Sequence, residues 1–167
     1  MKVINVQGRK KTGKTTTVIN IITELCRRGY SVGSIKGIHI EGFTMETGGD
    51  TAKHKTAGAN PVSSLCNDET NIMFSHRMGF AELLKHYDND WVVIEGHVDF
   101  DCPNIVTGRT AYYDGDGNDD SLEEQVNDLT VCCSGVVANT ETEFKGIPVI
   151  DPVNDIERLV DLIDNAV

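Results

Sequence analysis

Residues 8–15 combine glycines, basic side chains and hydroxyls at a spacing that suits phosphate binding. They read Gly-Arg-Lys-Lys-Thr-Gly-Lys-Thr, a glycine, four residues and then Gly-Lys-Thr, which is the phosphate-loop (P-loop) pattern. In such a loop the backbone N–H groups surround the phosphates, the lysine reaches the β- and γ-phosphates, and the threonine hydroxyl holds magnesium. We therefore expect Lys14 to act on the phosphates and Thr15 to bind Mg²⁺.

The segments around this loop must form a strand and a helix for the chemistry to work. Lys2–Gln7 predicts a short strand, and Lys14–Arg28 predicts a helix. The helix is expected to bury one apolar face, which consists of Val18, Ile19, Ile22, Leu25 and Cys26. Its N-terminus would add partial positive charge at the phosphates. Gly29 is suited to end the helix, and Ser31–Lys36 then predicts a second, parallel strand.

A second chemical signal lies at the end of an apolar run. Trp91–Gly96 reads Trp-Val-Val-Ile-Glu-Gly, which is typical of a strand buried on both faces of a parallel sheet. An unpaired carboxylate at the end of a core strand would be costly, so Glu95 is expected to serve a function. A carboxylate opposite a P-loop suits magnesium, and we assign Glu95 to the metal.

A glycine-rich loop over residues 36–49 is expected to leave the same sheet edge and to carry the polar candidates Lys36 and His39. After it, Asp50–Gly58 predicts a short helix with Asp50 at or near its N-cap. Simple capping explains Asp50 as well as a functional role does, and the spacing alone leaves both open.

The remaining pattern predicts an α/β fold with a mostly parallel sheet in one domain over residues 1–167. A β-hairpin is expected within residues 61–75, and a short helix at residues 80–87. The acidic run 114–120 lacks the final glutamate of a calcium loop and is expected to be solvated. Further strands are expected at residues 105–107, 129–137 and 147–150, and a final helix at residues 156–163. Residues 139–141 are expected near a nucleotide base.

Composition limits the classes of function. A net charge of −11 over 167 residues argues against nucleic-acid or acidic-membrane partners, because phosphate surfaces would repel the chain. The five cysteines are odd in number and lack metal-finger spacing. With no signal peptide and no long apolar run, a cytoplasmic location is expected. Cys26 is expected in the core, and one of Cys132 and Cys133 is expected to be buried, with a redox or metal role for that pair as the minor alternative.

Together these motifs resemble the MobB family, whose members take part in molybdopterin-guanine dinucleotide biosynthesis. The resemblance rests on Gly-x4-Gly-Lys-Thr-Thr, on Ile35-Lys36 with His39, on residues 50–59 (Asp-Thr-Ala-Lys-His-Lys-Thr-Ala-Gly-Ala), and on Trp-Val-Val-Ile-Glu-Gly96. Residues 103–109 are also similar. The chain departs from the family pattern at residues 97–99, where Phe-Lys is usual, and at Asn104, where lysine is usual.

The resemblance implies a three-layer α/β/α P-loop NTPase that binds GTP and Mg²⁺, hydrolyses GTP weakly, and forms a homodimer. It also implies a MobA-like molybdopterin nucleotidyltransferase as partner. The residues implied to contact the nucleotide are Gly8, Arg9, Lys10, Lys11, Thr12, Gly13, Lys14, Thr15 and Thr16. Thr15, Glu95 and Asp50 would face the metal or the attacking water, and Lys14, Asp50 and Glu95 would be catalytic. The hairpin would suit dimerisation.

Other classes of function stay open at the level of sequence. One is a non-catalytic adaptor that GTP switches by ordering the glycine-rich loop. A metal-delivery GTPase and a small-molecule kinase on the same fold are further alternatives. The five histidines are scattered and no arginine-bearing lid is visible, so neither of these two is favoured. No Asn-Lys-x-Asp motif reads guanine, so GTP rather than ATP follows from the resemblance.

Overall fold

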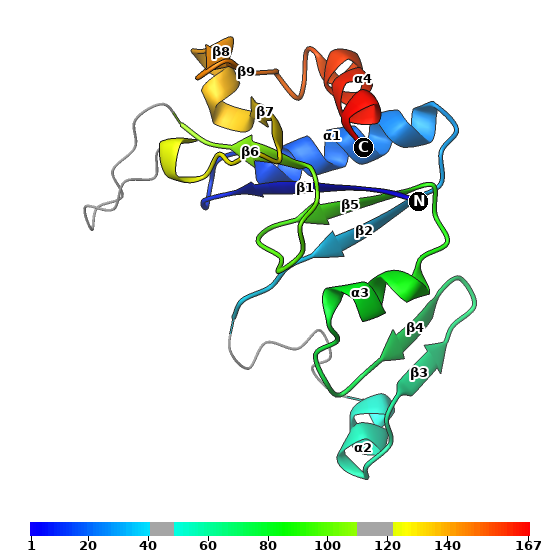
Figure 1. Ribbon diagram of the computed structural model, residues 1–167. Coiled ribbons are helices and arrows are strands. Elements are labelled where there is room, and N and C mark those ends of the chain that lie inside the picture. The colour runs from blue at the N-terminus through cyan, green and yellow to red at the C-terminus, as the bar shows by residue number, and fades with distance from the viewer. Residues whose placement is uncertain (41–48, 110–121) are drawn as a thin grey trace. The chain divides into compact units, whose positions relative to one another are not determined.

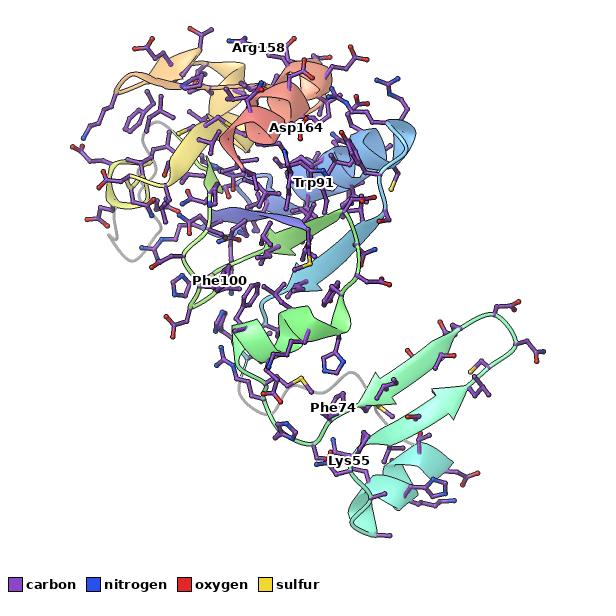
Figure 2. The ribbon with its side chains drawn as sticks, turned by 45° about the vertical axis from the view of Figure 1, so that its right-hand side comes forward. Lys55, Phe74, Trp91, Phe100, Arg158 and Asp164 are labelled. Atoms are coloured by element: carbon purple, nitrogen blue, oxygen red, sulfur yellow. The ribbon has the colours of Figure 1, made fainter. Side chains whose placement is uncertain are left out.

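The chain forms two compact units. The computed structural model describes residues 1–40, 49–109 and 122–167. The first unit consists of Met1–Gly37 with Leu84–Val167, and the second of Ile38–Leu83 (Figure 1). In Figure 2, Trp91 and Asp164 belong to the first unit and Lys55 and Phe74 to the second. That residues 1–167 form a single domain stays a prediction, because two compact units can belong to one domain or to two.

A five-stranded parallel sheet forms the centre of the first unit, with the strand order β2-β5-β1-β6-β7. The strands are β1 (Lys2–Gly8), β2 (Val32–Lys36), β5 (Trp91–Glu95), β6 (Asn104–Thr107) and β7 (Thr130–Ser134). Because every pair is parallel, the carboxyl ends of all five strands meet at one edge (Figure 1). The predicted α/β class and parallel sheet are confirmed.

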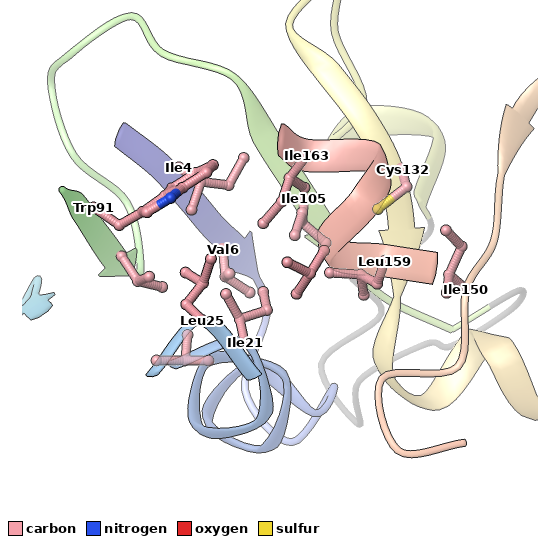
Figure 3. Close-up of a cluster of buried hydrophobic side chains, with 13 residues drawn as sticks. Ile4, Val6, Ile21, Leu25, Trp91, Ile105, Cys132, Ile150, Leu159 and Ile163 are labelled. Carbon is pink, nitrogen blue, oxygen red and sulfur yellow. The ribbon is translucent and has the colours of Figure 1, made fainter. Parts of the chain in front are cut away.

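Two helices cover one face of this sheet, namely α1 (Lys14–Arg27) and α4 (Ile156–Ala166). Their apolar side chains form one core cluster with alternate residues of the strands (Figure 3). The labelled members are Ile4, Val6, Ile21, Leu25, Trp91, Ile105, Cys132, Ile150, Leu159 and Ile163, all at most 1% exposed.

The face of α1 that is buried is rotated from the predicted one. Val18 and Leu25 are buried as expected, but Ile21 replaces Ile19, whose side chain is 55% exposed. Cys26 is also exposed, so its assignment to the core is wrong. Polar Thr17 and Glu24 take buried positions instead, because hydrogen bonds satisfy both side chains.

On the opposite face a second cluster is built around two short 3₁₀ segments, η2 (Leu122–Glu124) and η3 (Gly135–Asn139). Its buried members are Val106, Leu122, Cys133, Val137 and Val149. Cys132 and Cys133 therefore point to different faces of β7, and both are buried. Burial raises the pKa of Cys132 to about 12 and that of Cys133 to about 11, which keeps both thiols protonated at neutral pH.

The end of the sheet differs from the expectation. β7 ends at Ser134, because Gly135 turns the backbone to a φ of 79° and η3 begins there. Residues 147–150 were expected to form a full strand of the sheet. Instead β9 (Ile147–Pro148) pairs with β8 (Glu143–Phe144) in a separate antiparallel pair, and only one bridge joins Val149 to Cys133 of β7. Pro148 lacks the N–H that a sheet ladder needs.

The second unit contains α2 (Asp50–Thr56), β3 (Val62–Leu65), β4 (Thr70–Met73) and α3 (Phe80–Leu83), which the 3₁₀ turn η1 (Leu84–His86) of the first unit follows. The hairpin predicted within residues 61–75 is present, with Val62 opposite Met73. Phe74 (Figure 2) follows β4, and its ring centroid lies 5.9 Å from that of His76.

Two predicted segments lie outside the described residues. These are most of the glycine-rich loop, residues 41–48, and the acidic run 114–120. Among the helices that the structure does describe, none has the length and apolar character needed to span a bilayer.

Candidate functional site

The loop between β1 and α1 turns at three residues with a positive φ angle. Gly8 has a φ of 144° and Gly13 a φ of 98°, and Lys11 adopts a φ of 60° between them. The Thr12 side chain is buried inside the loop, where its hydroxyl donates to the Arg9 carbonyl at 2.8 Å. It also lies 2.7 Å from the Thr107 hydroxyl of β6. The loop is thus fixed to the neighbouring strand, while Arg9, Lys10 and Lys11 stay exposed.

The ends of β6 and β7 also hold this loop. The Val136 N–H donates to the Thr12 carbonyl at 3.0 Å, and a Cβ on Gly135 would lie 2.1 Å from that same oxygen. Only glycine fits this close approach. On the other side, Arg109 Nη2 donates to the Lys11 carbonyl at 3.2 Å. The carbonyls of Lys11 and Thr12 thus accept hydrogen bonds from residues outside the loop.

The N-terminus of α1 directly follows the loop. Gly13 precedes the helix, and its carbonyl accepts the Thr17 N–H at 2.9 Å. No side chain caps the helix by a hydrogen bond, and Thr15 and Thr16 lie exposed in its first turn. The first N–H groups of a helix have no intrahelical partner and carry partial positive charge. The N-terminus of this 14-residue helix therefore has the charge and the hydrogen-bond donors that suit an anion.

Lys14 extends its ammonium back over the loop. Its Nζ donates to the Arg9 carbonyl. The pKa of Lys14 is lowered, chiefly because burial disfavours the charged form; the Glu95 charge opposes this shift and the Lys36 charge adds to it. These effects mean that Lys14, Lys36 and Glu95 lie close enough to influence one another. Lys14 therefore lies over the loop, and its contact with phosphates stays a prediction.

Glu95, at the end of β5, collects donors from two other elements. Its Oε1 accepts a hydrogen bond from the Thr15 hydroxyl at 2.8 Å and an ion pair from Lys36 Nζ at 3.0 Å. The sheet register brings Lys36 close to Glu95, because Val6 of β1 and Lys36 of β2 are the two direct neighbours of Glu95 in the sheet. The structure therefore brings together Thr15 and Glu95, which the sequence assigned to magnesium. Their binding of the metal stays a prediction.

Asp50 belongs to the second unit and lies in the first turn of α2. Gly49, not Asp50, occupies the N-cap position. The Asp50 carboxylate accepts an ion pair from Lys53 at 2.7 Å, and both side chains are exposed, at 84% and 79%. First-turn placement beside the positive helix end accounts for the acid. Its catalytic and metal roles stay predictions.

The sequence did not assign Lys36, Arg109 and Thr107 to the site. The sequence predicts Lys36 both as the end of the second strand and as a polar candidate of the glycine-rich loop, and it is the last residue of β2. A usable signal existed: in a parallel sheet, the residues that end neighbouring strands share one edge. Thr107 ends β6 and Arg109 follows it, so the same rule places both residues at this edge. Asn139, a candidate for contact with a base, ends η3 and is exposed, and this contact stays a prediction.

Within the described ranges, no group of three or more histidine, cysteine, aspartate or glutamate residues is arranged to hold a metal ion. At the carboxyl edge of the sheet, Thr15 and Glu95 place two side-chain oxygens 2.8 Å apart. A pair of oxygen ligands suits Mg²⁺, which usually keeps several waters and binds through one or two protein groups with phosphates.

Comparisons with known proteins agree with this architecture. The family model MobB, molybdopterin guanine dinucleotide synthesis protein B, matches residues 3–126. The crystal structure of Bacillus subtilis MobB is similar with a TM-score of 0.76 and 19% identity, over 100% of this chain and 98% of that chain. A MobB homologue from Bacillus stearothermophilus gives 0.67 and 18%, over 99% and 98%. A search of curated proteins found no match. Since the family model covers most of the chain, the protein belongs to the MobB family.

Proposed function

We propose that this chain binds GTP with Mg²⁺ at residues 8–16 and hydrolyses it slowly, as an accessory protein in molybdopterin guanine dinucleotide synthesis. Family membership supports the role in this synthesis. The proposal for the nucleotide rests on the contact between the Thr15 hydroxyl and Glu95, 2.8 Å apart at the carboxyl edge of the sheet. A hydroxyl from a helix start and a carboxylate from a strand end meet where the P-loop pattern needs them.

Each residue of the loop has a definite task in this proposal. Backbone N–H groups of residues 8–13 and of the first turn of α1 bind phosphate oxygens. Lys14 exchanges its contact with the Arg9 carbonyl for the β- and γ-phosphates, and its charge stabilises the transferred phosphoryl group. Thr15 and Glu95 would hold Mg²⁺, which would neutralise negative charge on the phosphates.

The partner is proposed to be a MobA-like molybdopterin nucleotidyltransferase, with a homodimer of this chain as the working form. The family name supports this direction, because it specifies synthesis of a guanine dinucleotide. GTP rather than ATP follows from the same source. Discrimination would come from residues near the base, for which the exposed end of η3 at Asn139 is the candidate.

Nucleotide binding and turnover with a Lys14→Ala variant test the proposal. We expect wild type to bind a fluorescent GTP analogue in the presence of Mg²⁺ and to release phosphate slowly. Lys14→Ala should reduce phosphate release by about 100-fold or more, because a charge that stabilises the transition state is lost. Since Lys14 lies at the surface of the loop, circular dichroism should show an unchanged fold. If wild type neither binds nor cleaves GTP, the proposed function is wrong.

A further inference from the structure

One oxygen of Glu95 is shared between two donors from different elements. Its Oε1 lies 2.8 Å from the Thr15 hydroxyl and 3.0 Å from the Lys36 ammonium. The second contact is set by the sheet itself, because Lys36 and Glu95 are direct neighbours in the parallel register of β2 and β5. The sheet register therefore fixes the backbone of Lys36 beside Glu95.

The two partners of this ion pair differ in their access to water. The Glu95 side chain is 12% exposed, whereas the Lys36 side chain is 59% exposed. A carboxylate with so little solvent depends on its donors for stabilisation. The ammonium can turn into water at little cost. Lys36 is thus the exchangeable member of the pair, and Glu95 is the fixed one.

A divalent ion that uses Thr15 and Glu95 needs the oxygen that Lys36 contacts. An ammonium beside that oxygen would repel the ion, because like charges a few ångströms apart at a partly buried site interact strongly. Lys14 already lies within electrostatic reach of both Lys36 and Glu95. Metal without nucleotide would leave two lysine charges next to it, whereas nucleotide phosphates would give both lysines an anionic partner.

We propose that Lys36 is a positioning residue that acts as the exchangeable counter-cation of Glu95. The divalent ion displaces Lys36 from Glu95, and the nucleotide phosphates then accept it. Binding of metal and of nucleotide is thereby coupled: each favours the other, and the metal alone binds weakly. The inference rests on the proposed function, since it assumes that Glu95 and Thr15 hold a metal beside phosphates.

The test measures Mn²⁺ binding, with Mn²⁺ as a paramagnetic probe in place of Mg²⁺, by electron paramagnetic resonance of the free ion. Without nucleotide, Lys36→Met should bind Mn²⁺ about three- to fivefold more tightly than wild type, which is the scale of one partly exposed ion pair. A non-hydrolysable GTP analogue should raise the Mn²⁺ affinity of wild type more than that of Lys36→Met, because only wild type has the Lys36 charge that the phosphates accept. By linkage, Mn²⁺ should raise the affinity for the analogue by the same factor.

Two variants serve as controls. Lys2→Met removes the same charge from an ion pair with Asp164 at the opposite end of the sheet, beside Trp91, and it should leave Mn²⁺ affinity unchanged. Lys36→Arg keeps a cation at the position and should leave the coupling within about twofold of wild type. A general effect of net charge would instead change Lys2→Met and Lys36→Met alike, and this would overturn the inference.

The outcomes separate the inference from the proposed function. Normal nucleotide binding with unchanged Mn²⁺ affinity in Lys36→Met overturns the counter-cation role and leaves the proposed function standing. A wild type that binds no guanine nucleotide overturns the proposed function, and tighter Mn²⁺ binding by Lys36→Met would still support the exchange at Glu95. If wild type binds no guanine nucleotide and Lys36→Met does not change the Mn²⁺ affinity, both the inference and the proposed function are overturned.

Discussion

Gly8 is the residue at which backbone conformation and packing space constrain the phosphate loop most strongly. Its φ of 144° is one that side chains rarely adopt, and a Cβ there would lie 2.2 Å from the Thr107 carbonyl oxygen. Gly29, after α1, also has a positive φ, of 91°, but no atom of the residues that the structure describes lies within 4 Å of its Cβ position. Substituting each glycine by alanine therefore separates two contributions to the loss of stability, the strained backbone conformation and the steric clash of the added methyl group.

We expect Gly8→Ala to lower the free energy of unfolding more than Gly29→Ala does. Gly29→Ala should cost about 1–2 kcal/mol for the left-handed backbone alone. Gly8→Ala should cost about 1–3 kcal/mol more, because β1 and β6 must move apart to admit the methyl group. Urea unfolding followed by far-ultraviolet circular dichroism measures both. Equal losses would show that the strands yield without cost.

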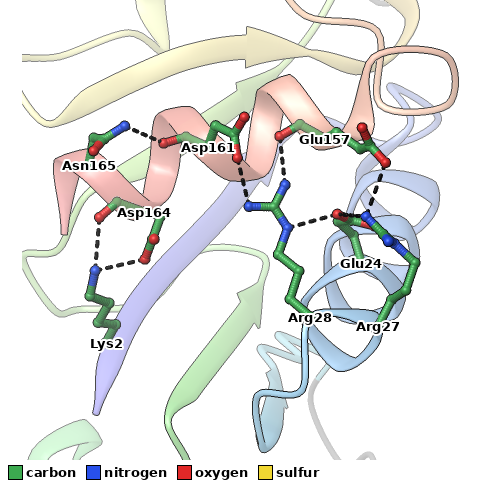
Figure 4. A network of polar contacts seen from close by, with 8 residues as sticks. All are labelled: Lys2, Glu24, Arg27, Arg28, Glu157, Asp161, Asp164 and Asn165. Atoms are coloured by element: carbon green, nitrogen blue, oxygen red, sulfur yellow. Dashed lines mark hydrogen bonds and ion pairs between the residues drawn. The ribbon is translucent and has the colours of Figure 1, made fainter.

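At the scale of elements, a network of charges joins α1 to α4 (Figure 4). Glu24 of α1 is 5% exposed and accepts from Arg27 at 2.6 Å and from Arg28 at 2.7 Å. The two arginines continue to α4, where they meet Glu157 at 3.0 Å and Asp161 at 2.6 Å. Hydrogen bonds from both arginines lower the pKa of Glu24 to about 2. A buried acid thus connects the two helices that cover the core.

Replacing Glu24 by Gln should destabilise the protein by about 1–3 kcal/mol at pH 7, the scale of charge-assisted hydrogen bonds. Because the pKa of Glu24 is lowered on folding, its stabilisation is complete above the unfolded value near 4.5 and is lost as the pH falls towards about 2. The difference in unfolding free energy between wild type and variant should shrink over that window. Chemical unfolding at several pH values measures it, and a difference that stays constant down to pH 2 would contradict the assignment.

Sequence pattern predicted most elements because their signals are local. The apolar run 91–94 and the glycines of the loop act through neighbouring residues, and β5 and α1 lie where they were expected. The burial of Ile21 and Glu24 rather than Ile19 and Cys26 depends on the position of α4. The position of α4 is set by tertiary packing, and the helical periodicity of α1 does not predict it.

In the candidate site, too, the sequence predicts features with local signals and misses those that tertiary packing sets. The sequence predicted that Thr15 and Glu95 would be neighbours, because a strand end and a helix start have fixed places in a parallel fold. Lys36 was missed as their partner, since its contact depends on which strand lies beside β5. The order β2-β5-β1 is a matter of topology, and no residue spacing specifies it.

On the scale of the whole molecule, charge is unevenly distributed. The chain has 15 basic against 26 acidic residues, yet the phosphate loop alone contributes Arg9, Lys10, Lys11 and Lys14. An acidic protein repels extended polyanions, while a local basic loop still attracts a single nucleotide. This contrast favours a small anionic ligand over a nucleic acid, in agreement with the proposed function.

The two units also differ in how they bury their apolar residues, which permits a test of their independence. Trp91, the only tryptophan of the chain, is 1% exposed in the core of the first unit, so its emission reports unfolding there. In the second unit, Ile72 of β4 is 58% exposed. Ile72→Thr keeps the β-branched shape that strands favour and removes little buried surface.

We therefore expect Ile72→Thr to leave the urea midpoint of Trp91 emission unchanged. As the matched comparison, Ile21→Ala in the first unit should lower the free energy of unfolding by about 2–5 kcal/mol, because Ile21 is fully buried between α1 and the sheet. A shift of the midpoint by Ile72→Thr as large as that by Ile21→Ala would mean that the side chain of Ile72 in β4 contributes to the stability of the first unit. An unchanged midpoint would mean that the exposed position of Ile72 can be substituted without loss of stability in the first unit.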